Sequence, residues 1–264
     1  GYFVDVLTTP LESFSTSFGI RLDNHESFDS EVTFRVAPVV KLEDSGTRIR
    51  GSVASGFKAP SLSQLYSSFG NPELEPEESI GWEIGIDQEF AEGLVRFGAT
   101  FFRNDIDQLI SFNSETFRSE NIAEAEITGF ELSLEVEPVE HLLLKADYTF
   151  TDAEDKNLRT QLLRRPENKF AFSGFYSFLE DRGQVGVRAN VVGHRSDTDF
   201  STFPSQSVRL GGYTVVDLLG SYRITETLEF FARVENLFDR EYQDVFGFGT
   251  PGVAGYGGLR VRFS

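Results

Sequence analysis

The sequence contains no cysteine and no methionine, and only three histidines and one tryptophan among its 264 residues. Without cysteine the chain forms no disulfide and has neither a thiol nucleophile nor thiolate metal ligands. The absence of methionine is unusual, because an ordinary usage of about two per hundred residues would give roughly five. We therefore expect the chain to be processed, excised from a longer protein or engineered.

Basic residues are scarce as well. There are 24 Lys and Arg against 42 Asp and Glu, which gives a formal net charge of −18. Nucleic acid is therefore excluded as a partner, because phosphate binding requires clustered cations. No run of 18 apolar residues is present, which excludes a membrane helix. No signal peptide is expected in the opening residues, which lack a basic start followed by an apolar core.

The chain instead shows repeated alternation of apolar and polar residues with a period of two, as in Val95, Phe97, Ala99 and Phe101. Such alternation is typical of β-strands with two unlike faces. About twelve strands are predicted, near residues 11–23, 29–42, 47–56, 79–90, 94–103, 125–137, 141–150, 168–178, 184–195, 212–222, 228–236 and 255–263.

The connections between these strands alternate between short turns and long loops. The long loops are predicted over 57–78, 104–124, 151–167, 196–211 and 237–254. In an antiparallel meander this order places all short turns at one end and all long loops at the other. The sequence therefore predicts an all-β, antiparallel transmembrane β-barrel with short periplasmic turns and long extracellular loops, as a single domain over residues 1–264.

One face of the predicted strands is almost purely apolar, and the other is charged. The charged face is expected to carry Arg21, Arg35, Lys41, Arg48, Arg50, Arg96, Lys145, Lys169, Arg188, Arg233, Arg260 and Arg262, opposite Glu83, Asp87, Glu89, Glu131, Glu135, Asp147, Asp217, Glu229 and Glu235. Such charges cost roughly 2–4 kcal/mol each at a bilayer midplane. We therefore expect the charged face to line a wet or protein-filled interior and the apolar face to contact outer-membrane lipid.

Five short motifs resemble those of TonB-dependent outer-membrane receptors. They are Gly56-Phe57-Lys58-Ala59-Pro60; Asn71-Pro72-Glu73-Leu74-Glu75-Pro76-Glu77; Arg103-Asn104-Asp105-Ile106 with Leu109-Ile110; the spaced residues Asn121, Ala125, Gly129 and Glu131; and Asn236-Leu237-Phe238-Asp239-Arg240-Glu241-Tyr242. Two further stretches, Leu162 to Arg165 and Asp199 to Pro204, look most like the cobalamin (vitamin B12) transporter branch, together with the residues that follow them, Val208, Leu210-Gly211-Gly212 and Asp217-Leu218.

The resemblance covers only the C-terminal barrel part of the family's 22-stranded, plugged receptors. It implies uptake of a metal chelate, best matched by cobalamin, with energy supplied by the TonB protein through the plug. The plug domain, the TonB-binding box and the N-terminal strands are not expected in this chain. The twelve strands therefore either form part of such a barrel or close as their own barrel.

Aromatic and amide side chains in three of the long loops are the candidate ligand-binding residues. They are Phe112, Asn113, Phe200, Ser201, Phe203, Gln206, Tyr242, Phe246 and Phe248. Several rings with nearby amides and hydroxyls suit a large, partly apolar ligand such as a corrinoid. An aromatic girdle or loop packing is the alternative explanation for any single ring, so the hypothesis concerns the set as a whole.

No enzyme is predicted, since three histidines without a visible orienting acid and oxyanion donors provide no catalytic arrangement. No cofactor is expected either. Calcium is a candidate at the acidic loops, and the weak candidate metal ligands are Glu73, Glu75, His194, Asp197 and Asp199. Two other functions are left open: a passive pore without a plug, and an engineered or excised barrel scaffold without native transport activity.

Overall fold

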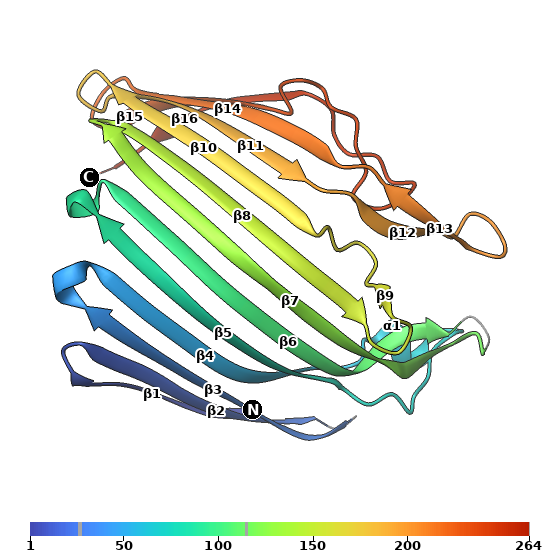
Figure 1. Cartoon of the computed structure of the whole chain (residues 1–264). Coiled ribbons are helices and arrows are strands. Elements are labelled where there is room, and N and C mark those ends of the chain that lie inside the picture. Colours follow the sequence, from blue (N-terminus) through green and yellow to red (C-terminus); the bar gives the residue numbers. More distant parts are fainter. Residues whose placement is uncertain (26–27, 114–115, 264) are drawn as a thin grey trace. The chain divides into compact units, whose positions relative to one another are not determined.

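The computed structural model describes residues 1–263 except 26–27 and 114–115. It contains two compact units, each built from several segments of the chain. Unit 1 comprises Gly1–Gln88, Ala99–Phe130 and Asp152–Leu162, and unit 2 comprises Glu89–Gly98, Glu131–Thr151 and Leu163–Ser264. Almost all regular structure in both units is antiparallel β-strand (Figure 1). None of the helices among the described residues has the length and apolar character needed to span a membrane.

The described residues form sixteen strands and three short helical segments. The strands are β1 (Tyr2–Leu11), β2 (Phe14–His25), β3 (Phe28–Leu42), β4 (Thr47–Lys58), β5 (Glu77–Phe90), β6 (Val95–Asn113), β7 (Arg118–Val139), β8 (Leu142–Asp155), β9 (Thr160–Gln161), β10 (Asn168–Phe178), β11 (Gly183–Val192), β12 (Arg195–Asp199), β13 (Gln206–Leu210), β14 (Tyr213–Arg223), β15 (Leu228–Glu235) and β16 (Ala254–Val261). The helical segments are η1 (Glu43–Ser45), α1 (Leu62–Tyr66) and η2 (Ala91–Gly93).

Within each unit, neighbouring strands follow the order of the chain. In unit 1 the strands β1 to β5 pair in sequence, and β9 pairs with the end of β8. In unit 2 the strands β8, β10, β11, β14, β15 and β16 pair in sequence. The strands β12 and β13 form a separate hairpin within the connection from β11 to β14. The predicted all-β antiparallel meander is therefore confirmed.

The estimate of about twelve strands is too low, because four strands were not predicted. Strand β1 has apolar residues on both faces, including Phe3 and Val4, so it lacks the alternation that identified the others. The remaining three, β9, β12 and β13, are short polar strands inside the predicted loops 151–167 and 196–211.

The loop predicted over 104–124 is also wrong for most of its length. Strand β6 continues to Asn113 and β7 begins at Arg118. Gln108 adopts the left-handed backbone conformation, with φ of 56°, in the middle of β6. A residue in this conformation interrupts the two-residue alternation, which is why the strand could not be followed from the sequence. Phe112 and Asn113 consequently lie at the end of a strand rather than in a loop.

Large apolar side chains of the sheet are exposed rather than buried. On the strands of unit 2, for example, Tyr176 is 47% exposed and Val185, its register partner on β11, is 49% exposed. Among the described residues the buried apolar side chains are only Leu65, Leu74, Ala125, Ala153 and Leu210. This distribution is the reverse of that in a water-soluble protein and is typical of strands whose apolar face contacts lipid.

The opposite face carries ion pairs in which one carboxylate bridges two cations. In unit 1, Asp87 bonds Arg48 at 2.8 Å and Arg50 at 3.3 Å. The same arrangement occurs at Glu126 with Arg103 and Lys156, at Glu135 with Arg96 and Lys145, and at Glu229 with Arg260 and Arg262. Because the cations and the carboxylate come mostly from neighbouring strands, these bridges tie the strands together on their charged face.

Replacing Glu135 by Gln tests the contribution of one such bridge. Arg96 and Lys145 would then lose the anion that they share, and we expect the free energy of unfolding in detergent to fall by about 1 kcal/mol. The measurement is urea unfolding followed by tryptophan fluorescence. The control is Glu137→Gln on the same strand, where no ion pair is present among the described residues. Equal effects of the two substitutions would contradict the role assigned to the bridge.

Candidate functional site

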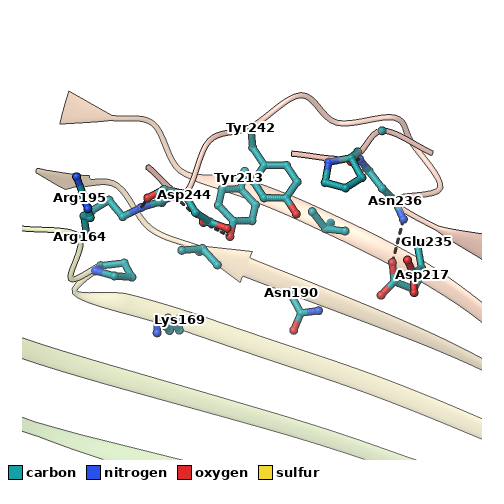
Figure 2. Close-up of a pocket in the computed structure, with 15 residues that line it drawn as sticks. Arg164, Lys169, Asn190, Arg195, Tyr213, Asp217, Glu235, Asn236, Tyr242 and Asp244 are labelled. Atoms are coloured by element: carbon teal, nitrogen blue, oxygen red, sulfur yellow. Dashed lines mark hydrogen bonds and ion pairs between the residues drawn. The ribbon is translucent and has the colours of Figure 1, made fainter. Parts of the chain in front are cut away.

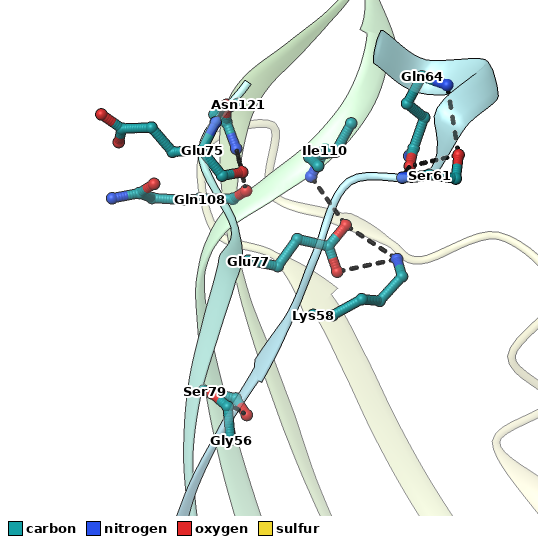
Figure 3. A network of polar contacts seen from close by, with 10 residues as sticks. All are labelled: Gly56, Lys58, Ser61, Gln64, Glu75, Glu77, Ser79, Gln108, Ile110 and Asn121. Carbon is teal, nitrogen blue, oxygen red and sulfur yellow. Dashed lines mark hydrogen bonds and ion pairs between the residues drawn. The ribbon is translucent and has the colours of Figure 1, made fainter. Parts of the chain in front are cut away.

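In unit 1, the long loop between β4 and β5 is held at its base by Glu77. This side chain is only 7% exposed, and its two carboxylate oxygens each lie 3.0 Å from the ammonium of Lys58. The backbone N–H of Ile110 also donates to Glu77, at 3.1 Å (Figure 3). Helix α1 begins within this loop, at a capping box formed by Ser61 and Gln64. Lys58, Glu77 and Ile110, which belong to the motifs described above, thus fix the base of the β4–β5 loop.

Asn121 fixes the second half of the same loop. Its side-chain amide donates to the carbonyls of Glu75 and Gln108, at 2.9 and 2.8 Å, and its oxygen accepts from the N–H of Glu75. Figure 3 shows the Glu75 side chain pointing away from this network. Glu73 is exposed too. Within the described residues, no group of three His, Asp or Glu side chains is arranged to hold a metal ion.

In unit 2, the carboxylate of Asp197 connects three long loops. Asp197 lies on β12 and is fully buried, with 0% exposure. Its Oδ1 accepts from Arg164 Nε in the β8–β10 loop at 2.8 Å, and its Oδ2 accepts from the N–H of Phe246 in the β15–β16 loop at 2.7 Å. The N–H of Thr198 donates to Oδ1 as well. The loops that contain Arg164, Asp197 and Phe246 are therefore joined at one point.

Arg195, two residues earlier on β12, strengthens the same junction. It is 3% exposed, and its guanidinium donates to the backbone carbonyl of Gln243 and to the carboxylate of Asp244. It also lies 5.5 Å above the ring of Tyr213, whose hydroxyl donates to Asp244 at 2.9 Å. Tyr213 in turn stacks on Tyr242, with ring centroids 4.1 Å apart. We call these residues around Asp197 and Arg195 the loop junction.

Asn236 fixes the start of the β15–β16 loop. It is 4% exposed, and its backbone N–H donates to Asp217 at 2.9 Å. Its side-chain oxygen accepts from the backbone N–H of Arg240, and its side-chain amide donates to the carbonyls of Arg240 and Pro251. The loop is therefore folded back on itself at its base, which places Tyr242 beside the strands.

A pocket of about 610 Å³ lies beside the loop junction on the charged face of the sheet (Figure 2). This volume is in the range of small-molecule sites. The pocket is lined by residues of β10, β11, β14 and β15 and of the loops: Arg164, Pro166, Lys169, Asn190, Val192, Arg195, Tyr213, Val215, Asp217, Glu235, Asn236, Tyr242, Asp244, Pro251 and Gly252. Among the candidate residues from the sequence, Tyr242 is the one that lines it.

The other candidate residues of unit 2 lie around the junction or beyond it. Phe246 is bonded to Asp197 through its backbone. Phe200 and Phe203 are 70% and 89% exposed in the turn between β12 and β13, and Phe248 is exposed as well. The remaining candidates are also near this hairpin: Ser201 bonds Asp199, Gln206 opposes Asp199 across the hairpin, and His194 is exposed.

Two of the candidate ligand-binding residues belong to unit 1. Phe112 packs edge-on against Phe69 and Phe117, with centroids 6.0 and 6.4 Å away. The side-chain amide of Asn113 donates to Glu120 at 2.8 Å. These contacts make Phe112 and Asn113 part of the hairpin formed by β6 and β7.

Sequence reasoning did not select Arg164, Lys169, Arg195, Tyr213 or Asn236 as site residues. Arg164 and Asn236 lie within motifs that resemble those of the receptor family, so their positions in these motifs could have marked them as candidates. For Arg195 and Tyr213 the sequence contains no signal, because their contacts come from loops far away along the chain. Lys169 was expected on the charged face, but the sequence does not indicate that it lines a pocket.

The antiparallel meander, its exposed apolar side chains and its long loops are typical of the wall of an outer-membrane β-barrel. The family model "TonB dependent receptor-like, beta-barrel" matches residues 1–237, and the chain therefore belongs to this family. This membership confirms the outer-membrane location and the expectation that the protein is not an enzyme, since the family consists of transport receptors.

Solved structures of the same fold include the siderophore receptor PirA from Acinetobacter baumannii, with 21% identity and a TM-score of 0.80 over 99% of this chain and 45% of that one. A variant of the ferric enterobactin receptor PfeA from Pseudomonas aeruginosa matches with 19% identity and a TM-score of 0.81, over 99% and 44% of the two chains. The copper transporter OprC matches with 17% identity and a TM-score of 0.80, over 99% and 46%. The chain thus spans less than half the length of these proteins.

Replacing Asp197 by Asn tests the loop junction. The amide keeps the size of the side chain but removes the charge that Arg164 and the N–H of Phe246 bind. We expect hydrogen-exchange protection of the Phe246 amide to fall about tenfold or more, as charged hydrogen bonds contribute about 1.5–3 kcal/mol each. Asp199→Asn on the same strand is the control. If both variants lose the same protection, Asp197 does not hold the β15–β16 loop.

The junction should also depend on pH in a defined direction. Burial is the largest influence on Asp197 and opposes its ionisation. The N–H groups of Phe246 and Thr198 and the guanidinium of Arg164 outweigh it and hold the pKa of Asp197 below its ordinary value of 3.8. The stabilisation is therefore complete above that value and is lost as the pH falls through the lowered pKa.

We accordingly expect the Phe246 amide, corrected for its intrinsic exchange rate, to stay protected from neutral pH down to about pH 4 and to lose protection below it. In the Asp197→Asn variant this acid-dependent step should be absent. Loss of protection near neutral pH would contradict the assignment to Asp197.

Proposed function

We propose that this chain forms the C-terminal barrel wall and ligand-binding loops of a receptor that imports a metal chelate across the outer membrane. Family membership supports this function. The observation that carries it is the loop junction, where three long loops meet at the buried Asp197 beside a pocket of about 610 Å³. Loops joined in this way present a pre-formed surface to a ligand, which lowers the conformational entropy lost on binding.

The remaining parts of the receptor follow from the same proposal. A plug domain and the N-terminal strands would complete the barrel, and TonB would act through the plug. The charged face of the sheet, with its bridged cations, would contact the plug or water, and the apolar face would contact lipid.

For the chelate itself we propose cobalamin. The support is the resemblance of Leu162–Arg165 and Asp199–Pro204 to the cobalamin branch. Arg164 of the first stretch bonds Asp197 in the loop junction, and the second stretch is the exposed turn of the hairpin that contains Asp197. The solved structures named above are described as receptors for siderophores and as a copper transporter. A ferric siderophore is therefore the second candidate.

The test is a binding titration of the complete receptor, purified in detergent, with cyanocobalamin and with ferric enterobactin. Saturable binding of cyanocobalamin in preference to ferric enterobactin is the expected result. Binding of ferric enterobactin alone would overturn cobalamin and retain the metal-chelate function. Failure of both chelates to bind would contradict the proposed function.

The aromatic side chains of the loops should contribute to this binding. Replacing Phe200, Phe203, Phe246 and Phe248 together by Ala removes four rings from the loops that meet at the junction. We expect the affinity for the bound chelate to fall at least about tenfold, because aromatic anchors dominate binding energies. The control is Phe238→Ala, which removes an equally exposed ring near the base of the β15–β16 loop. Unchanged affinity in the fourfold variant would show that the rings do not bind the chelate.

A further inference from the structure

The residues that form the floor of the pocket are arranged in three rows across the strands. The first row contains Lys169, Val192 and Tyr213, which are register partners on β10, β11 and β14. The second row contains Asn190 and its partner Val215. Asp217 lies in the third row, four residues beyond Tyr213 on β14. At about 3.3 Å per residue, the first and third rows are roughly 13 Å apart along the strands.

The first row forms a cationic end of the pocket. The ammonium of Lys169 has neither a hydrogen bond nor an ion pair with any described residue. Arg164, above it, uses Nε to bond Asp197, and Arg195 is buried with its Nη1 unpaired. Asp244 also lines this end, but Arg195 and the hydroxyl of Tyr213 already bind its carboxylate. Positive charge therefore remains available at this end.

The third row forms an acidic end. Asp217 accepts the N–H of Asn236 but makes no ion pair with any described residue. Its register partner Arg188 lies over the ring of Phe175 instead. Glu235 on the adjacent β15 also lines this end and pairs with Arg233 at 3.1 Å. One carboxylate, that of Asp217, therefore remains without a cation.

The wall between the two ends is aromatic and apolar. Figure 2 shows Arg164, Arg195 and Lys169 on one side of the view, Asp217 and Glu235 on the other, and the rings of Tyr213 and Tyr242 between them. Val192 and Val215 add apolar lining, and Asn190 supplies a single amide. A ligand that spans the pocket would thus meet positive charge, an aromatic surface and negative charge in that order.

We propose that the pocket binds an extended zwitterion with a carboxylate at the Lys169 end, an ammonium at the Asp217 end and an apolar middle. A short peptide, or the peptide-like arm of a chelate, has this chemistry. The proposal refines the function proposed above, because it rests on the pocket being part of the receptor's ligand site. Peptide binding and chelate uptake are measured separately, so that either can fail without the other.

The probe is a peptide of three residues with a central phenylalanine, which extends to about 10 Å and so approaches the length of the pocket. Four forms are titrated into the complete receptor in detergent: the free peptide, the N-acetylated peptide, the C-amidated peptide and the doubly blocked one. We expect the free peptide to bind, and each single block to weaken binding about tenfold, as expected for loss of one charge-assisted contact.

Two variants assign the two ends. In Lys169→Gln, the free and C-amidated peptides should bind equally, while acetylation should still weaken binding. In Asp217→Asn, which keeps the oxygen that accepts the N–H of Asn236, the free and acetylated peptides should bind equally. The controls are Lys41→Gln on β3 and Asp147→Asn on β8, which remove one cation and one anion outside the pocket. In both controls, acetylation and amidation should each still weaken peptide binding.

The proposal is overturned if the free peptide does not bind, or if blocking its ends leaves the affinity unchanged. It is also overturned if Lys169→Gln does not remove the effect of C-amidation, or if Asp217→Asn does not remove the effect of N-acetylation. If the peptides follow the expected pattern while no metal chelate binds, the zwitterion site stands and the import function fails. The reverse result leaves chelate import in place without this site.

Discussion

The two-residue alternation of apolar and charged side chains is the constraint on which the rest of the structure depends. It assigns one face of each strand to an apolar surrounding and leaves the other face crowded with charge. On that second face, each of four carboxylates, at Asp87, Glu126, Glu135 and Glu229, lies between two cations, so that part of the charge is paired. The strands then form a scaffold whose ends hold the long loops.

The loops are held in place by buried polar side chains. Asp197 and Arg195 in unit 2, and Glu77 in unit 1, are nearly inaccessible to solvent and bond backbone groups far away along the chain. Asn236 is buried as well and bonds backbone groups within its own loop. A buried charge is costly unless it is fully paired, so each such residue favours a single loop arrangement. This explains how a protein with few buried apolar residues fixes long loops in place.

The strands and their faces could be predicted from the sequence, because alternation is a local signal that each strand carries by itself. The loop junction could not. His194, Asp197 and Asp199 have the spacing of metal ligands, yet Asp197 is buried against Arg164 and Phe246, which are 33 and 49 residues away. Whether a carboxylate is buried depends on which loops meet in the folded chain, and a local sequence pattern does not contain this information. The left-handed conformation of Gln108 is likewise visible only once β6 has formed.

The β12–β13 hairpin is fixed at its base and not at its turn. Arg195 and Asp197 hold the base, whereas the bonds among residues 199–204 are local ones, from Ser201 to Asp199 and from Thr202 to the carbonyl of Pro204. Changes of length or composition in this turn therefore leave the scaffold untouched. On a bacterial surface, this turn is where antigenic variation would have the lowest structural cost, and it is also a suitable position for inserting a displayed epitope.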